Sequence, residues 1–554
     1  MVMATLKLPS WQSFSVWIKS IWKPLALILG TSILLAFLLA WISTGSIYSV
    51  LPFLVITLLS GLMLWGAWGL FGKEQLPGWL GYLLVGAVLL RLAAGVVWYV
   101  ALPGWGHDSQ AEKAGYIMAD AAERDQEAWK LAQSDQPLWS AFRNNRSADQ
   151  YGGMLFISAL VYRYLGGQAH LPLQMVVISA AFSSLAVLFT WGLARRAWSA
   201  PTARLAAWGM ALYPEVVLLG SSQMREAFLV PLTAAAFYGL LRYRQNNERA
   251  GLVWGVAAVL LCLAFSPPIA ILLLALLAIT TLAMAGSFKD LLRQRWFWPV
   301  AIALLLIVLA GVWLALKQFA PARMNNPLEM ISWWLRKSAD LQAYLSQHAS
   351  GWMQKIFRST PEWMHLPLLV TYGVLQPFLP AALVAGSHAP AWPWIVAWRS
   401  IGWTVLLVFL IYALILAFLE KSKDQNPFGP RFARLTSLTV WVVVLLASFR
   451  GGADMWDNPR YRASFAGLQI ALAAWAWIEH RRQADPWLRR VLVGVALILA
   501  WFMPWYLRRY TGLEWPVVDL FKTLGLGFAS TILFILWDWA RVDPLPAERD
   551  TQPI

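Results

Sequence analysis

Long apolar segments recur along almost the whole chain and restrict its possible folds more than any other feature. The 554 residues are 59% hydrophobic and 13% charged, whereas soluble domains carry about 25% charged residues. Apolar runs of about 18 residues or more are typical of transmembrane helices. We predict an all-α polytopic membrane protein with about 14 spanning helices, at residues 23–43, 47–72, 78–102, 171–194, 203–219, 226–243, 251–265, 269–285, 297–316, 394–419, 434–449, 463–479, 489–507 and 517–540.

The start of the chain and its cysteine content exclude some alternatives. Residues 1–23 are basic and no small-residue cleavage pattern follows the apolar segment 25–41, so we expect a retained first helix rather than a signal peptide. Cys262 is the only cysteine in the sequence. The chain therefore forms no internal disulfide and no cysteine-based zinc or redox site.

The distribution of basic residues predicts the topology. A net charge of +16 would suggest nucleic acid in a soluble protein, but here the excess lies mostly in short loops, and we expect no nucleic-acid partner. Cytoplasmic loops carry the Lys and Arg excess in membrane proteins. The basic N-terminus and Lys73 are therefore expected in the cytoplasm, with the arginine-rich loops 195–204, 242–249, 289–295, 421–434 and 481–490.

Two apolar stretches must not span if the sides are to alternate. We interpret 151–165 and 366–383 as interfacial or re-entrant, because both contain Gly or Pro and the first is short for a span. Two long loops, 103–170 and 317–392, then face outside. We expect an integral protein of the bacterial plasma membrane, in contact with membrane lipids, with its active site on the outer face.

Both long loops carry amphipathic patterns. Ser109-x-x-Glu112 is a capping-box pattern for a helix start. Apolar residues from Ala114 to Trp129 recur at helical spacing, which predicts one amphipathic helix at the membrane interface. In the second loop we predict further amphipathic helices that carry Trp333, Trp334, Leu335, Tyr344, Trp352, Ile356 and Phe357.

Asp108 is the first candidate catalytic residue. It follows the apolar segment 78–102 and adjoins His107, a candidate substrate-binding residue, at the start of the outside loop. A carboxylate where water meets lipid can have a raised pKa and act as a general base or a metal ligand. The alternative is a solvated loop acid or a partner of a helix dipole.

Arg225 and Glu226 begin an apolar helix after an outside turn. Charged residues there are costly in lipid and tend to be functional, so Glu226 is a second catalytic candidate and Arg225 a substrate-binding one. The alternative is an acid that a helix N-terminus favours. Arg91, in the middle of an apolar segment, must face the bundle or a wet cavity, and we favour a structural role as a member of an ion pair.

Arg460, Tyr461 and Arg462 are candidate substrate-binding residues in the last long outside turn. The guanidinium fork binds phosphate through two hydrogen bonds, and the positive-inside rule does not require arginines on this side. The alternative is contact with ordinary anionic lipid headgroups.

In order along the chain, these features resemble membrane glycosyltransferases of the GT-C fold, which include aminoarabinose and protein-mannosyl transferases. The motifs are an acid after an early helix, Asp149-Gln150-Tyr151-Gly152-Gly153, Leu193-Ala194-Arg195-Arg196, Met224-Arg225-Glu226 and Arg460-Tyr461-Arg462. The resemblance covers about residues 78–480. We expect a GT-C-like core there, after an N-terminal extension of two transmembrane helices (1–77) and before C-terminal transmembrane helices with a short cytoplasmic tail (481–554).

The resemblance implies transfer of a sugar from a polyprenyl-phosphate donor to a lipid, glycan or protein acceptor on the outer face, with inversion. Asp108 would be the base, and Arg460 and Arg462 would hold the donor phosphate. His107-Asp108 stands where many relatives have an acid pair, so the use of a divalent metal ion (Mg or Mn) stays open. A transporter or flippase, and a polymerase or ligase of lipid-linked saccharides, are the alternatives.

Overall fold

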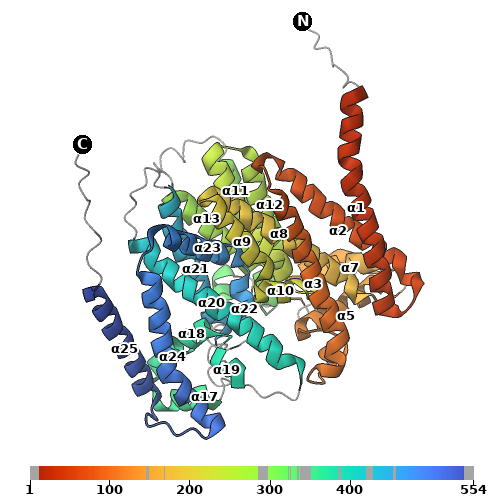
Figure 1. Ribbon diagram of the computed structural model, residues 1–554. Helices are drawn as coiled ribbons and strands as arrows, with labels where there is room; N and C mark the ends of the chain where they lie inside the picture. The colour runs from red at the N-terminus through yellow and green to blue at the C-terminus, as the bar shows by residue number, and fades with distance from the viewer. Residues whose placement is uncertain are drawn as a thin grey trace, which may run out of the picture.

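The computed structural model is an assembly of helices (Figure 1), and no strand occurs among the residues it describes. It describes the chain except for residues 1–10, 145–148, 168, 285–296, 322–323, 325, 334–335, 337–350, 378, 385–388, 420–427, 453, 455–456 and 542–554. The longer helices are α1 (Trp11–Thr44), α2 (Val50–Leu70), α3 (Gly78–Trp105), α5 (Ala119–Gln133), α7 (Gly153–Leu165), α8 (Pro172–Ala197), α9 (Ala200–Leu212), α11 (Glu226–Asn246), α12 (Arg249–Phe265), α13 (Pro267–Ala283), α15 (Phe297–Phe319), α17 (Gly351–Ser359), α18 (Glu362–Leu375), α20 (Ala391–Leu419), α21 (Phe428–Gly451), α23 (Ala466–Gln483), α24 (Trp487–Thr511) and α25 (Leu520–Arg541).

The polytopic all-α fold that the sequence predicted is confirmed. Eight of the described helices are long and apolar enough to cross a membrane. They lie in α1, α2, α3, α8, α20, α21, α24 and α25. The expected helices 251–265 and 269–285 are present as α12 and α13, at 17 residues each, which is the lower limit for a span. The total number of spans stays a prediction.

Helix α8 is the centre of the bundle. It packs against α2, α3, α9, α11 and α23, and nearly all of its side chains are buried. Small residues such as Ala180, Ser183 and Ser184 face these neighbours, and small side chains allow close helix approach in membranes. By contrast, α1 and α25 expose most of their apolar side chains and lie on opposite flanks of the molecule (Figure 1).

The predicted helix 203–219 is two helices, α9 and α10 (Pro214–Gly220). Pro214 has no N–H, and its ring disfavours helical geometry at Tyr213, which is extended. The break leaves carbonyls at the end of α9, and Arg91 satisfies them. Its guanidinium donates to the carbonyls of Met210 and Ala211 at 3.0 and 3.3 Å. The buried mid-helix arginine therefore binds backbone carbonyls, and no ion pair of the kind that we favoured is present among the described residues.

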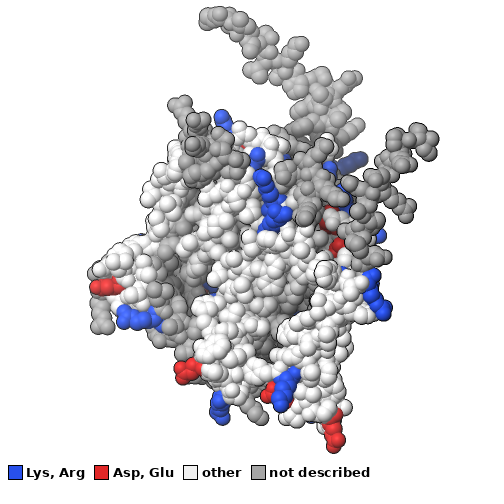
Figure 2. Space-filling model, turned by 90° about the vertical axis from the view of Figure 1, so that its left-hand side faces the viewer, with Lys and Arg blue, Asp and Glu red and all other residues white. Residues whose placement is uncertain are grey.

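The two stretches expected not to span are short helices. Within 151–165 the structure has α7 from Gly153, whose 13 residues measure about 20 Å, less than the bilayer core of about 30 Å. Residues 366–383 divide between α18 and α19 (Leu379–Val384). On the face that Figure 2 shows, the described charged side chains are sparse and leave a broad uncharged expanse, as a lipid-facing surface requires.

Candidate functional site

In the first long loop, the segment from Gln110 to Gln133 forms two helices instead of the single amphipathic helix that we predicted. A short α4 (Gln110–Lys113) ends before Gly115, whose φ of +82° lies in the left-handed region. A Cβ at Gly115 would lie 2.8 Å from the carbonyl oxygen of Tyr99, so only glycine fits this close approach. Helix α5 then starts at Ala119 and packs on α7. The turn at Gly115 determines where the acids of α5 lie.

The capping box at the start of this loop is present in a modified form. The Ser109 hydroxyl accepts the N–H of Glu112 at 3.2 Å. The Glu112 carboxylate, in turn, accepts the N–H of His107, whereas a standard box would use the N–H of Ser109 itself. The His107 ring stacks on Trp392, with centroids 5.3 Å apart. His107 therefore connects the loop to the start of α20.

Asp108 lies in this turn as an exposed side chain. It has a φ of +62°, which is uncommon for a residue other than glycine and costs about 1–3 kcal/mol. Its carboxylate is 83% exposed and lies 3.7 Å from the ammonium group of Lys113. Among the described residues, Asp108 does not contact Glu226. Whether the two share one substrate stays a prediction.

Glu226 belongs to a group that we call the acid–arginine cluster: Asp120, Arg225, Glu226 and Arg460. The Glu226 Oε1 lies 3.5 Å from the Nε of both Arg225 and Arg460. Arg460 also donates from Nη1 to Asp120 at 2.9 Å. The cluster joins the starts of α5 and α11 to α22 (Asp457–Ala463). Glu226 is buried, and its Oε2 accepts no hydrogen bond from any described residue.

Asp120 is the functional candidate that the sequence interpretation missed. Its side chain is 52% exposed. Partial burial raises the pKa of Asp120, but the Arg460 guanidinium outweighs that effect and holds the pKa below its usual value. The sequence signal was an acid in the first turn of a helix, but we predicted no helix start there. Because we predicted one continuous helix instead of a helix that starts at Ala119, we interpreted Asp120 as one of several solvated acids on an amphipathic helix.

The Asp149-to-Gly153 motif holds α7 beside this cluster. Asp149 accepts the N–H groups of Tyr151 and Leu155 at 3.4 and 3.0 Å and so caps α7. Its carboxylate also lies 4.0 Å from the Nε of Arg124. The Tyr151 ring lies below the Arg225 guanidinium, 5.2 Å from ring centre to Cζ, at cation–π distance. The motif thus positions an arginine of the cluster.

The two arginines of the late motif have different surroundings. Arg460 lies in the cluster, and its guanidinium is 5.5 Å from the centre of the Tyr461 ring. Arg462 is 1% exposed and lies 3.3 Å above the Trp403 ring. It donates to the Gln376 carbonyl, whereas its Nε and Nη1 have no hydrogen-bond partner among the described residues. Burial lowers the pKa of Arg462 to about 10, so it is charged at neutral pH.

The second long loop is described only in part. Ile356 and Phe357 on α17 are buried and pack near Leu369 of α18. Trp334, Leu335 and Tyr344 lie outside the described residues. The amphipathic helices expected there stay a prediction.

In the described part of the chain, too few ligand side chains lie together to bind a metal ion. Mg²⁺ and Mn²⁺ prefer several oxygen ligands. No group of three or more His, Cys, Asp or Glu side chains among the described residues is arranged to hold a metal ion. In the cluster, an arginine lies between Asp120 and Glu226. These residues do not fit a metal centre.

Comparison with known proteins supports a glycosyltransferase. The family described as dolichyl-phosphate-mannose-protein mannosyltransferase matches residues 155–314. The matched segment is less than half of the chain, and it contains Arg225 and Glu226. No curated protein sequence matches the chain.

Solved structures of the oligosaccharyltransferase of Archaeoglobus fulgidus are similar only distantly. AglB in complex with an inhibitory peptide and a dolichol-phosphate is 12% identical, with a TM-score of 0.39, over 83% of this chain and 56% of that one. The apo form is 12% identical, with a TM-score of 0.41, over 84% and 58%. A complex with Zn and sulfate is 13% identical, with a TM-score of 0.38, over 80% and 53%. The chain spans little more than half the length of these proteins. The match to a protein-mannosyltransferase family confirms, over residues 155–314, the resemblance to GT-C membrane glycosyltransferases.

Proposed function

We propose that this protein transfers a sugar from a polyprenyl-phosphate donor to an acceptor at the extracytoplasmic face of the membrane, with inversion at the anomeric carbon. The observation that carries the proposal is the acid–arginine cluster. It combines a buried carboxylate with a free oxygen, a half-exposed second carboxylate, and arginines beside both. Such a group can accept a proton and neutralise a phosphate in one place.

The proposed reaction is a single displacement. The oxygen of an acceptor hydroxyl attacks the anomeric carbon of the donor sugar from the face opposite the phosphate. The bond between that carbon and the phosphate oxygen breaks, and polyprenyl phosphate leaves with the electron pair. The hydroxyl proton passes to a carboxylate of the protein. Attack from the opposite face inverts the configuration, as in other direct displacements at sugars.

The leaving phosphate needs cations, and two arginines of the late motif supply them. Arg462 has two nitrogens without a hydrogen-bond partner among the described residues. Buried N–H groups that lack an acceptor, such as the Nε and Nη1 groups of Arg462, favour an anion. Arg460 already holds two carboxylates. A phosphate at Arg460 therefore competes with Asp120, and its arrival would release the Asp120 carboxylate.

Two acids of the first long loop compete for the role of base. Asp108 has the position after α3 that the family resemblance favours, but its carboxylate is exposed beside Lys113. Asp120 contacts the arginine that would bind the phosphate. We propose Asp120 as the base, with Glu226 orienting the donor through its free Oε2. Asp108 remains the alternative base.

The acceptor is a hydroxyl-bearing lipid, glycan or protein, and the donor is a lipid-linked sugar. The test is an assay of purified protein in nanodiscs with polyprenyl phosphates that carry mannose, glucose or arabinose. We expect release of polyprenyl phosphate and transfer of the sugar for at least one donor. Glu226→Gln keeps the size of the side chain but removes its charge, and it should abolish release. Equal release by wild type and Glu226→Gln would contradict the proposal.

A further inference from the structure

A buried aspartate that the proposed reaction does not use lies at the centre of a second polar group. Asp125, on α5, is fully buried. It accepts hydrogen bonds from the Tyr116 hydroxyl at 2.5 Å, from His170 Nε2 at 2.6 Å and from the Tyr162 hydroxyl. We call these four residues the Asp125 anchor. A buried carboxylate is unfavourable unless hydrogen bonds satisfy it, and three donors do so here.

The three donors come from different parts of the chain, so the Asp125 anchor holds α5 against all of them. Tyr116 belongs to the turn between α4 and α5, Tyr162 to α7, and His170 lies just before α8. The His170 ring also stacks on Trp129 of α5, with centroids 5.1 Å apart. Burial and the Asp125 carboxylate raise the pKa of both tyrosines. Their hydroxyls therefore keep their protons at neutral pH and donate.

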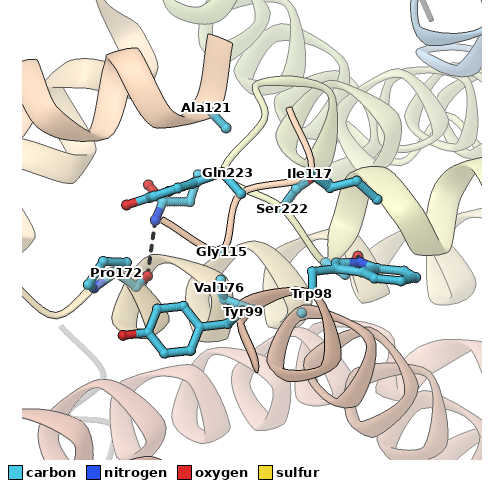
Figure 3. Close-up of a pocket in the computed structure, with 12 residues that line it drawn as sticks. Trp98, Tyr99, Gly115, Ile117, Ala121, Pro172, Val176, Ser222 and Gln223 are labelled. Atoms are coloured by element: carbon cyan, nitrogen blue, oxygen red, sulfur yellow. Dashed lines mark hydrogen bonds between the residues drawn. The ribbon is translucent and has the colours of Figure 1, made fainter. Parts of the chain in front are cut away.

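The start of α8 also holds the other half of the acid–arginine cluster. The Gln223 side-chain nitrogen donates to the Pro172 carbonyl at 3.0 Å, as Figure 3 shows. Arg124, on α5, donates from Nη1 to the Gln223 carbonyl at 3.0 Å. Glu226 follows soon after Gln223 in the chain. Helix α5 and the turn before α11 are thus both fixed to the start of α8.

The position of α5 decides whether Asp120 reaches Arg460. Asp120 lies in the first turn of α5 and pairs with Arg460 of α22 at 2.9 Å. Asp125 follows five positions later, and residues at this spacing point about 140° apart around a helix. The Asp125 side chain points to α7 and the start of α8, so it acts on Asp120 through the helix.

We infer that Asp125 is a positioning residue for the transfer reaction, because by fixing α5 against α7 and α8 it keeps Asp120 beside Arg460. This inference rests on the proposed function, in which Asp120 is the base. It adds a residue outside the acid–arginine cluster on which turnover depends. Misplacement of a catalytic group by 1 Å can lower a rate about 10²-fold.

The first test measures turnover and donor affinity of Asp125→Ala in nanodiscs. The change removes the acceptor of all three hydrogen bonds, so α5 loses its fixed position. We expect kcat to fall about 10²-fold. Equilibrium binding of the sugar-bearing polyprenyl phosphate should not weaken, because Arg460 and Arg462 stay in place.

Tyr162→Phe is the milder variant if Asp125→Ala fails to fold. It removes one donor and keeps the ring, and it should lower kcat in the same direction. Tyr164→Phe is its control, since Tyr164 lies on the same helix but is 67% exposed. Its kcat should match that of wild type.

The pH profile gives a result that a purely structural role would not produce. Burial raises the pKa of Asp120, whereas Arg460 lowers it most, and Arg124 and Arg225 act in the same direction as Arg460. When α5 moves, Asp120 loses Arg460, and its pKa should rise toward the usual value. The acid limb of kcat/KM should therefore move to higher pH in Asp125→Ala.

Asp538→Ala is the matched control. Asp538 is also buried, and it also accepts hydrogen bonds from a neighbouring helix, from Arg489 and Arg490 of α24. It lies on α25, on the opposite side of the molecule from α5 (Figure 1). The change should lower the Tm but leave kcat and the acid limb as in wild type.

The outcomes separate this inference from the proposed function. If wild type transfers sugar and Asp125→Ala keeps its kcat and its acid limb, the inference is wrong and the proposed function stands. A fall in kcat without movement of the acid limb would mean that Asp125 contributes only to stability, and it would also overturn the inference. If wild type releases polyprenyl phosphate from no donor, the proposed function is wrong, and the inference with it.

Discussion

At the scale of single residues, the chemistry of the site depends on which carboxylate accepts the proton. Glu226 is buried and paired through one oxygen with two arginines. Asp120 is half-exposed and paired with Arg460 alone. Asp108 is exposed beside a lysine. A base must reach the acceptor hydroxyl and stay ionised. The lowered pKa of Asp120 keeps it ionised, and its contact with Arg460 is the reason that we propose it as the base.

We therefore expect Asp120→Asn to lower turnover about 10²- to 10⁴-fold, the usual contribution of a general base. Donor affinity should not fall, because the amide keeps the shape of the side chain and no longer competes with the phosphate for Arg460. Asp108→Asn is the comparison, and it should retain most of the turnover. Steady-state assays at saturating donor measure both. The opposite pattern, with loss only in Asp108→Asn, would assign the base to Asp108.

The pH dependence of turnover tests the pairing of Asp120 with Arg460. The pKa of Asp120 lies below its usual 3.8, although burial acts to raise it. The carboxylate is therefore ionised throughout the neutral range in the donor-free protein, and kcat/KM, which reports that state, should fall only as the pH drops below about 3.8. Arg460→Gln removes the main group that lowers the pKa of Asp120, so burial should raise that pKa. The acid limb of the pH profile should then move to higher pH.

Arg450→Gln is the control for that measurement. Arg450 also approaches the Tyr461 ring, at 6.0 Å, but it is not among the groups that lower the pKa of Asp120. Its acid limb should match that of wild type. Identical limbs in all three proteins would mean that Asp120 is not the titrating base.

At the scale of elements, the apolar pattern predicted most helices to within a few residues, because long apolar runs have few alternatives in a membrane. The exceptions are local breaks. Pro214 divides α9 from α10, and Gly115 divides α4 from α5. Both residues can be read in the sequence, but the periodic spacing of apolar residues continues on either side of them and so gives no sign of a break. Contacts between distant segments decide both breaks. Arg91 donates hydrogen bonds to the carbonyls that the break at Pro214 leaves free, and the Tyr99 backbone leaves no room for a Cβ at Gly115.

Gly115→Ala should destabilise the protein and reduce turnover together. The alanine would adopt an unfavourable φ near +82° and meet the Tyr99 backbone at 2.8–2.9 Å. Strain of this kind costs about 1–3 kcal/mol, and relief would move α5, which carries Asp120. Gly104→Ala is the control, since open space surrounds that position. Thermal unfolding in detergent should show a lower Tm for Gly115→Ala alone.

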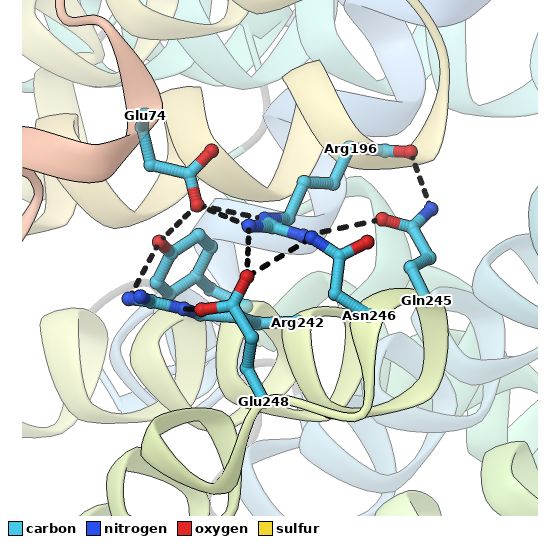
Figure 4. A network of polar contacts seen from close by, with 7 residues as sticks. Glu74, Arg196, Arg242, Gln245, Asn246 and Glu248 are labelled. Carbon is cyan, nitrogen blue, oxygen red and sulfur yellow. Dashed lines mark hydrogen bonds and ion pairs between the residues drawn. The ribbon is translucent and has the colours of Figure 1, made fainter.

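At the scale of the whole molecule, two polar sites mark opposite ends of the same helices. The N-terminal ends of α8 and α11 carry Pro172, whose carbonyl accepts Gln223, and Glu226 of the acid–arginine cluster. Their C-terminal ends carry Arg196 and Arg242, in the polar network of Figure 4. A helix of 21 residues, such as α11, measures about 31 Å, close to the thickness of the bilayer core.

The polar network of Figure 4 connects helices at the end of the bundle opposite to the acid–arginine cluster. Glu74, between α2 and α3, accepts Arg196 Nε at 2.9 Å and the Tyr238 hydroxyl at 2.7 Å. Arg242 donates to Glu248 at 2.6 Å. The sequence predicted this end to be basic and cytoplasmic, but not its pairing with Glu74 and Glu248. Charge counts predict a side of the membrane, whereas partners depend on the packing of distant segments.

The last prediction concerns which end faces outside. In a Cys262→Ala background, we expect a membrane-impermeant maleimide to label Ser134→Cys, at the end of α5, in intact cells. Asn247→Cys, exposed between α11 and α12, should be labelled only after permeabilisation, because the positive-inside rule assigns that loop to the cytoplasm. Ser346→Cys would test the second long loop in the same way, although position 346 lies outside the described residues. Asn247 is exposed and Ser134 is half-buried; neither belongs to the cluster, so retained activity can verify folding. If Asn247→Cys is labelled in intact cells and Ser134→Cys only after permeabilisation, the topology is inverted, and the acid–arginine cluster faces the cytoplasm.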